Sequence, residues 1–136
     1  MTGYPTIRLT AIDTTDVRGL ADFYRELLGY RYRPGDEPPT GGPDNADWLV
    51  LQDGAGADRL AFQEVERLER TTWPSHDVPM QMHLDLTVAD RDELERQRGR
   101  AEALGAALIM DRTDDPDVPL YVLADPSGHP FCILVW

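Results

Sequence analysis

Cysteine, basic residues and long hydrophobic runs are all scarce in this chain of 136 residues. The only cysteine is Cys132, so no disulfide can form within the chain. No apolar run approaches the length of about 20 residues that a membrane-spanning helix requires. The N-terminal residues also lack the basic segment followed by an apolar stretch that marks a secretion signal. We therefore expect a cytoplasmic protein without a membrane partner.

The charge balance excludes another class of partner. Thirteen basic residues stand against 25 acidic ones, which gives a formal net charge of −12. No cluster of basic residues offsets this excess locally, and an acidic surface repels a phosphate backbone. We therefore expect no nucleic-acid partner. The acidity would favour a cationic ligand, although runs of charged residues more often simply face the solvent.

One pattern occurs twice in the chain. Residues 7–29 and 82–105 each contain an alternating strand, an aspartate, an amphipathic helix and a final Leu-Gly pair. Each half is too short to be more than marginally stable alone, so two copies predict one duplicated domain. We assign a single domain to residues 1–136, with a first module at 6–66, a linker at 67–80 and a second module at 81–136.

Each module is predicted to run strand, helix, then three strands. In the first module we expect strands at 7–13, 30–33, 48–52 and 59–65, with a helix between Asp16 and Gly29. In the second we expect strands at 81–89, 107–111, 120–124 and 130–135, with a helix between Asp90 and Gly105. The loop at 34–47 is dense in proline, glycine and aspartate. This loop and the linker are expected to contribute to ligand specificity.

Three segments carry a resemblance to a known superfamily. DVRGLADFYRELLG at 16–29, HLDL at 83–86 and ADPSGHPFCI at 124–133 resemble motifs of the vicinal oxygen chelate superfamily, which includes glyoxalase, bleomycin-resistance and dioxygenase-like proteins. The resemblance is to its small glyoxalase-like members. It implies an α+β fold in which two βαβββ modules form a curved eight-stranded mixed sheet around a cavity, usually in a homodimer. It does not identify the reaction.

The resemblance also implies where a metal would bind. Metal enzymes of the superfamily place ligands on the first and last strands of each module, and these positions correspond here to Leu9, Gln63, His83 and Cys132. Only His83 is an ordinary ligand for the divalent ions concerned, because leucine offers no donor and a thiolate suits zinc rather than harder ions. We therefore expect neither a metal nor another cofactor. A protein that holds a small organic ligand unaltered, as bleomycin-resistance proteins do, is the favoured function.

An enzymatic alternative rests on His83 and Asp85. Strand periodicity places both on one face, where the carboxylate would orient the imidazole as a general acid or base for a lyase or isomerase. A histidine with a purely structural hydrogen bond explains the same pattern. A further alternative is an atypical metal-dependent enzyme that uses Gln63, His83 and Cys132. The sequence leaves open whether the protein is an enzyme.

The candidate ligand-binding residues share a predicted position facing the cavity, and they are Leu9, Trp48, Gln63, His83, Asp85 and Cys132. Cys132 has two interpretations. It is either a buried small apolar side chain or a nucleophile beside His83. No glycine pattern of the phosphate-binding type is present, so we expect no nucleotide site.

Overall fold

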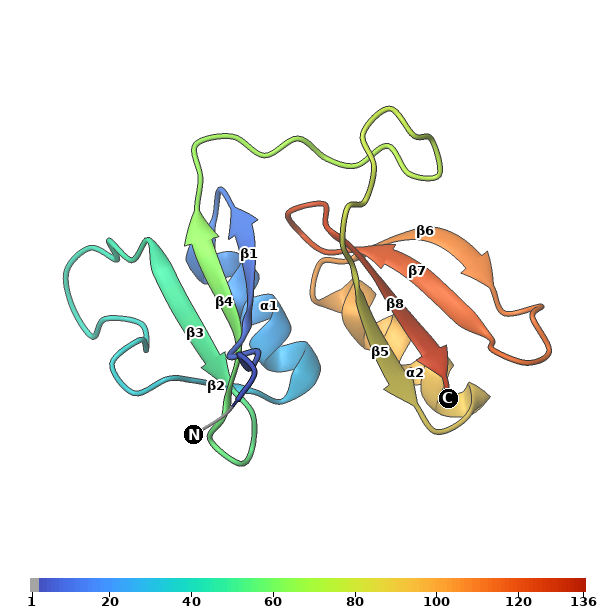
Figure 1. Ribbon diagram of the computed structural model, residues 1–136, viewed down its shortest axis with the longest axis horizontal. Helices are drawn as coiled ribbons and strands as arrows, with labels where there is room; N and C mark the ends of the chain where they lie inside the picture. The colour runs from blue at the N-terminus through green and yellow to red at the C-terminus, as the bar shows by residue number, and fades with distance from the viewer. Residues whose placement is uncertain (1–2) are drawn as a thin grey trace. The chain divides into compact units, whose positions relative to one another are not determined.

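The computed structural model describes residues 3–136 and divides the chain into two compact units, with the boundary between Leu68 and Glu69. Each unit contains one helix and four strands in the order strand, helix, strand, strand, strand (Figure 1). The predicted α+β class and the two βαβββ modules are therefore confirmed. The eight strands form two four-stranded mixed sheets, and neither sheet closes on itself.

The first unit has its sheet in the strand order β1-β4-β3-β2. Only β1 and β4 pair in parallel, whereas the β2–β3 and β3–β4 pairs are antiparallel. A parallel pair needs a long crossover connection rather than a hairpin, and here the chain leaves β1 through helix α1. The elements are β1 (Thr10–Thr14), α1 (Val17–Leu28), β2 (Arg31–Tyr32), β3 (Trp48–Gln52) and β4 (Asp58–Glu64).

Helix α1 begins and ends where its sequence predicts. The side chain of Asp16 accepts a hydrogen bond from the backbone N–H of Gly19, and Gly29 ends the helix in the left-handed conformation at φ 69°. The apolar face of the helix is buried against the sheet. On that face the ring of Tyr24 stacks on Phe62 of β4, with ring centroids 5.8 Å apart. This aromatic pair lies at the centre of the core of the first unit.

Arg18 attaches the long loop at 34–47 to helix α1. Its guanidinium donates hydrogen bonds to the Asp44 carboxylate and to the carbonyl oxygen of Asp36, both at 2.7 Å. It also lies over the ring of Tyr32, 4.9 Å from the ring centroid. The partners lie on either side of the proline-rich stretch, so a single side chain holds both ends of the loop.

We expect Arg18→Ala to release this loop. Hydrogen bonds to charged groups contribute about 1.5–3 kcal/mol, and a change of about 1.4 kcal/mol alters an opening equilibrium tenfold. Limited proteolysis within residues 34–47 should therefore accelerate by about tenfold or more. Arg59→Ala is the matched control, because Arg59 pairs with Asp53 in an exposed turn elsewhere in the unit. Equal cleavage rates in the two variants would contradict the anchoring role.

The second unit repeats the arrangement with the strand order β5-β8-β7-β6. Here β5 and β8 are the parallel pair, while the β8–β7 and β7–β6 pairs are antiparallel. The elements are β5 (Leu84–Val88), α2 (Arg91–Ala103), β6 (Ala107–Arg112), β7 (Leu120–Ala124) and β8 (Pro130–Val135).

Helix α2 is far more polar than α1. Asp90 caps it by accepting a hydrogen bond from the backbone N–H of Glu93 at 2.8 Å, as the sequence predicts. Within the helix only Leu94 and Ala101 are buried. The hydroxyl of Tyr121 on β7 donates a hydrogen bond to Glu95 of the helix at 2.5 Å, which shows that Tyr121 lies on the helix-covered face of the sheet. None of the helices in residues 3–136 combines the length and the apolar character needed to span a bilayer.

The first strand of each module is shorter than predicted. Strand β1 starts at Thr10 rather than residue 7, and β5 starts at Leu84 rather than residue 81. Gln81 has a φ of 60°, which no regular strand accommodates. Met82, which alternation places on the helix side, is instead 77% exposed, because the regular alternation begins only after this turn.

Candidate ligand-binding site

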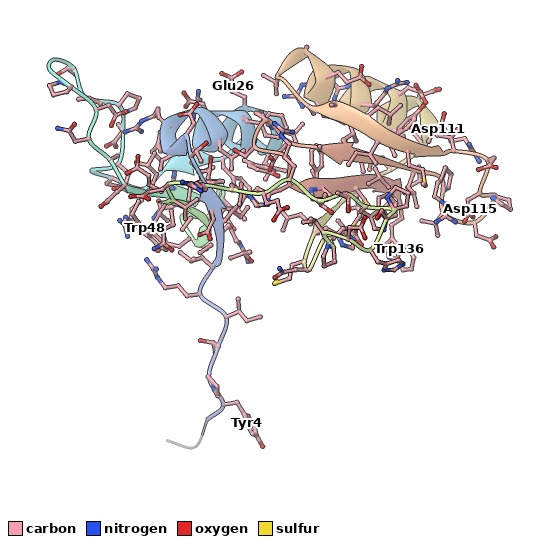
Figure 2. All side chains as sticks on the ribbon, turned by 90° about the horizontal axis from the view of Figure 1, so that it is seen from above. Tyr4, Glu26, Trp48, Asp111, Asp115 and Trp136 are labelled. Carbon is pink, nitrogen blue, oxygen red and sulfur yellow. The ribbon has the colours of Figure 1, made fainter. Side chains whose placement is uncertain are left out.

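The second sheet has one face covered by α2, and its other face carries a pocket of about 610 Å³. All residues that line the pocket belong to the second unit. The volume falls within the range of about 300–1,000 Å³ typical of sites for small molecules. Its apolar lining consists of Trp73, Met80, Val118, Leu120, Val122, Leu134 and Trp136, and its polar lining consists of His83, Asp85, Thr87, Arg112 and the thiol of Cys132. Trp136 lies on the side of the sheet away from α2 (Figure 2).

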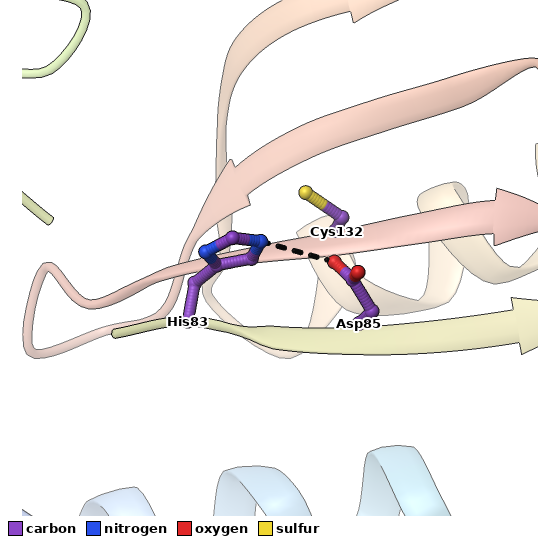
Figure 3. Close-up of side chains that lie close together, drawn as sticks. All are labelled: His83, Asp85 and Cys132. Atoms are coloured by element: carbon purple, nitrogen blue, oxygen red, sulfur yellow. Dashed lines mark ion pairs between the residues drawn. The ribbon is translucent and has the colours of Figure 1, made fainter. Parts of the chain in front are cut away.

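Three of the predicted site residues meet at one edge of this pocket (Figure 3). Asp85 on β5 stands opposite Cys132 on β8 in the parallel ladder, so the two side chains point to the same face. His83 lies just before β5, and its Nε2 is 3.2 Å from Oδ1 of Asp85. One potential donor atom from each of the three residues lies within 4.8 Å of the others. The predicted pairing of His83 with Asp85 is therefore present.

The polar pair is accessible to a ligand. The side chains of His83 and Asp85 are 39% and 56% exposed. An ion pair this exposed contributes little to stability, at most about 1 kcal/mol. A purely structural role would predict a more buried histidine, so the arrangement favours contact with a bound molecule.

Cys132 differs from its two neighbours because it is buried, with 7% of its surface exposed. Burial, and then the negative charge of Asp85 and a hydrogen bond to its carboxylate, together raise the pKa of the Cys132 thiol to about 11. At neutral pH the side chain is therefore a protonated thiol. This favours the interpretation of Cys132 as a small, weakly polar part of the pocket wall rather than as a nucleophile.

We expect native Cys132 to react slowly with iodoacetamide at pH 7. The rate should rise roughly tenfold per pH unit until it approaches the thiol pKa, because the thiolate is the reactive form. Asp85→Asn removes the charge that helps to raise this pKa, so it should accelerate the reaction at neutral pH. Mass spectrometry of the labelled protein gives the rates. Asp111→Asn, on the helix-covered face of β6, is the control expected to react like the wild type, and fast labelling of the native wild type would refute the assignment.

The cluster provides one nitrogen, one oxygen and one sulfur donor. Zinc accepts this combination, and three protein ligands leave a fourth position open for a water molecule or substrate. Harder ions such as magnesium prefer oxygen donors and fit the set poorly. A zinc ion would be held by His83, Asp85 and Cys132, and its binding would displace the thiol proton. The metal site considered from the sequence used Gln63, His83 and Cys132, whereas the cluster in the structure has Asp85 in place of Gln63.

The sequence-based prediction that Gln63 occupies the same position in the first module as Cys132 in the second is wrong. The true counterpart of Cys132 lies two residues before Gln63. Ala11 and Asp85 both precede the N-cap aspartate of their module's helix by five residues, so they occupy equivalent positions. Ala11 pairs with Ala61, whereas Asp85 pairs with Cys132. The first-module counterpart of Cys132 is therefore Ala61. Neither Ala11 nor Ala61 has a side-chain donor, so the first module has no counterpart of this polar pair.

The remaining predicted ligand-binding residues lie in the first unit and are not part of the pocket lining. Leu9 precedes β1 and is partly exposed. Trp48 and Gln63 face one another across β3 and β4. Trp48 also borders a smaller hollow of about 220 Å³ beneath the loop held by Arg18. The contribution of these three residues to ligand binding remains a prediction.

Several lining residues were not predicted. Thr87 and Leu134 follow from alternation, because they lie two residues beyond Asp85 and Cys132 on the same face. Arg112 was missed because the predicted strand ends at residue 111, whereas β6 extends to Arg112, which opposes Leu120 in the ladder. Met80 lies in the segment that the sequence treats only as a linker, and no pattern there marks it as part of a pocket wall.

Comparison with known proteins agrees with this architecture. The profile of the glyoxalase-like domain matches residues 10–134. The fold is similar to a glyoxalase/bleomycin resistance protein/dioxygenase family enzyme from Burkholderia phytofirmans PsJN, with a TM-score of 0.68, 17% identity and coverage of 94% of this chain and 96% of that one. A fosfomycin resistance protein from Listeria monocytogenes gives a TM-score of 0.68 at 12% identity, with coverage of 98% and 95%. A lactoylglutathione lyase from Agrobacterium tumefaciens gives 0.60 at 17%, with coverage of 98% and 96%.

At these identities the solved structures establish the fold and not the activity. No curated protein matches the chain significantly. The profile match covers nearly the whole chain, and the structural neighbours carry the same fold, so the resemblance drawn from the three sequence motifs is confirmed. The chain belongs to the glyoxalase-like domain family, within the vicinal oxygen chelate superfamily.

Proposed function

We propose that the protein binds a small organic molecule in the pocket of the second unit. The observation that carries this proposal is the composition of the lining, in which seven apolar side chains are accompanied by a few polar ones. Small-molecule sites characteristically combine an apolar wall with a few polar groups that fix the orientation of the ligand. In this proposal the ligand packs against Leu134 and Leu120, and its polar end contacts His83 and Asp85.

Two of the three tryptophans line the pocket, which allows a direct binding assay. A ligand that enters should change the fluorescence of Trp73 and Trp136. It should also raise the melting temperature, because it binds only the folded state. A thermal-shift screen of small organic molecules, followed by fluorescence titration of each hit, tests both effects. Trp48→Phe removes the signal from the first unit and should leave the binding signal unchanged. A hit whose signal comes only from Trp48 would count against this site.

A second candidate function is a zinc-assisted lyase or isomerase, and the observation in its favour is the His83–Asp85–Cys132 cluster. With zinc bound, His83 and Asp85 would serve with Cys132 as its ligands. Without zinc, His83 would instead hold or transfer a proton at its imidazole, and Asp85 would orient the ring. Bound zinc would supply Lewis-acid chemistry, which stabilises negative charge on a substrate oxygen. The structural neighbours include a lactoylglutathione lyase, so a lyase has a precedent on this fold.

The zinc candidate makes a prediction that does not depend on activity. Zinc should bind with one-to-one stoichiometry and release a proton, because the Cys132 thiol is protonated in the free protein at neutral pH. Isothermal titration in buffers of different ionisation enthalpy measures that proton directly. Affinity should rise with pH as the cost of deprotonation falls. Cys132→Ser should weaken binding by at least about tenfold, and unchanged affinity in this variant would rule out the proposed ligand set.

We further propose that the protein is a cytoplasmic homodimer and that residues 1–136 form one cooperative domain. Superfamily membership supports the dimer, and light scattering coupled to gel filtration measures it. A single unfolding transition shared by both units would support the one-domain assignment, whereas two separable transitions would contradict it.

A further inference from the structure

The floor of the pocket is built from two rows of side chains that run across the second sheet. Residues that face each other in a ladder lie on the same side of the sheet. One row contains Asp85, Cys132 and Val122 from β5, β8 and β7. The other contains Thr87, Leu134, Leu120 and Arg112 from β5, β8, β7 and β6. All seven residues line the pocket, so the floor extends from one edge strand to the other.

The two ends of this floor carry opposite charges. Asp85 lies on the edge strand β5, and Arg112 lies on the opposite edge strand β6. Three strand intervals of about 4.8 Å separate these edges, so the two backbones are roughly 14 Å apart. The residues between them are the apolar Leu134, Leu120 and Val122, together with the protonated Cys132. Both side chains line the pocket, so a ligand that contacts both spans no more than about this distance of 14 Å.

The charge at the Arg112 end is available to a ligand. Within residues 3–136 its guanidinium takes part in no ion pair. The nearby Asp115 carboxylate instead accepts hydrogen bonds from the backbone N–H groups of Val118 and Asp117, at 3.0 and 2.9 Å. These amides, and then the charge of Arg112, lower the pKa of Asp115. Arg112 therefore retains the donors with which a guanidinium binds a carboxylate in two parallel hydrogen bonds.

We propose that the pocket selects an elongated amphoteric molecule. Its cationic or hydrogen-bond-donating end binds Asp85, its apolar body lies over Leu134 and Leu120, and its anionic end binds Arg112. This inference rests on the proposed function, because it names the ligand class of the same pocket. An amine or a carboxylate alone uses one charged end and leaves the other unsatisfied. A molecule with both groups at the correct spacing uses both ends.

A series of straight-chain ω-amino acids from aminohexanoic to aminododecanoic acid tests the spacing. The matched alkylamines and alkanoic acids carry only one charged end, and the matched neutral alcohols carry none. Binding to the full chain is followed by fluorescence and isothermal titration. We expect the best amino acid to bind at least about tenfold more tightly than either matched single-charge compound, with an optimum at an intermediate chain length.

Two variants assign the ends. Arg112→Gln should lower the affinity for the best amino acid by about tenfold and leave the affinity for the matched amine unchanged. Asp85→Asn should do the reverse, lowering affinity for the amino acid but not for the alkanoic acid. Arg96→Gln, on the exposed surface of α2, is the control expected to bind every probe like the wild type.

The outcomes separate this inference from the proposed function. If amines, acids and neutral alcohols bind as tightly as the amino acids, and Arg112→Gln has no effect, the amphoteric ligand class is wrong while the pocket remains a binding site. If no compound of any series binds, the proposed function fails as well.

Discussion

Leu134→Trp is expected to abolish ligand binding while leaving the fold intact. Leu134 lies in the middle of the pocket floor and is only partly buried, so a larger ring can extend into the pocket instead of into the core. The indole would occupy the space that we assign to the apolar body of the ligand. Because the ligand would lose this contact and meet a steric block, affinity should fall by about 100-fold or more, which corresponds to about 2.7 kcal/mol.

Fluorescence or calorimetric titration with a hit from the screen measures this loss, and circular dichroism shows whether the fold is retained. Leu108→Trp is a suitable control, because Leu108 lies on the same sheet, is 39% exposed and does not line the pocket. The control should bind like the wild type. If Leu134→Trp bound equally well, the ligand would have to lie elsewhere in the molecule.

Phe62→Ala should cause the largest loss of stability among these variants. Phe62 is fully buried in β4, and its ring stacks on Tyr24 with an interplanar angle of 19°. Removal of the ring leaves a cavity and takes away the side chain that stacks on Tyr24. Replacement of a buried phenylalanine by alanine costs about 3–5 kcal/mol, which is a large fraction of the stability of a typical small domain.

Urea unfolding followed by circular dichroism gives the change in free energy. Gln63→Ala, at the next position of the same strand, is the control, because its side chain is exposed and a change at such a site usually stays within about 0.5 kcal/mol. A loss below about 1 kcal/mol for Phe62→Ala would show that this aromatic pair is not central to the core.

The fold was predictable because its signals are local. The cap at Asp16, the left-handed end at Gly29 and the positions of the later strands each depend on a few neighbouring residues. The structure confirms the cap and the helix end, and it places the later strands within one residue of their predicted bounds. The predicted starts of β1 and β5 were wrong. The turn at Gln81 and the exact pairing of the edge strands depend on contacts between residues that are distant in sequence. Burial of Met82 was overestimated for the same reason.

The candidate site was predictable only in part. His83 and Asp85 are two residues apart, so strand alternation was enough to pair them. The third member, Cys132, is 47 positions beyond Asp85, and its place beside that carboxylate depends on the ladder register. The register of the β1–β4 pair likewise shows that the first-module counterpart of Cys132 is Ala61 and not Gln63. Counting residues from the sequence motifs could not show this.

The two helices contribute unequally to the interiors of their units. In the first unit a broad apolar face of α1 packs on the sheet, whereas α2 contributes only Leu94 and Ala101 to the interior of the second. Segments with few buried apolar contacts open at lower free energy, and amide hydrogen exchange reports such opening. The pocket belongs to the second unit, whose helix has the smaller apolar face. A ligand that bridges β5 and β6 would therefore add contacts that α2 does not provide. The second unit would become more rigid when its pocket is filled.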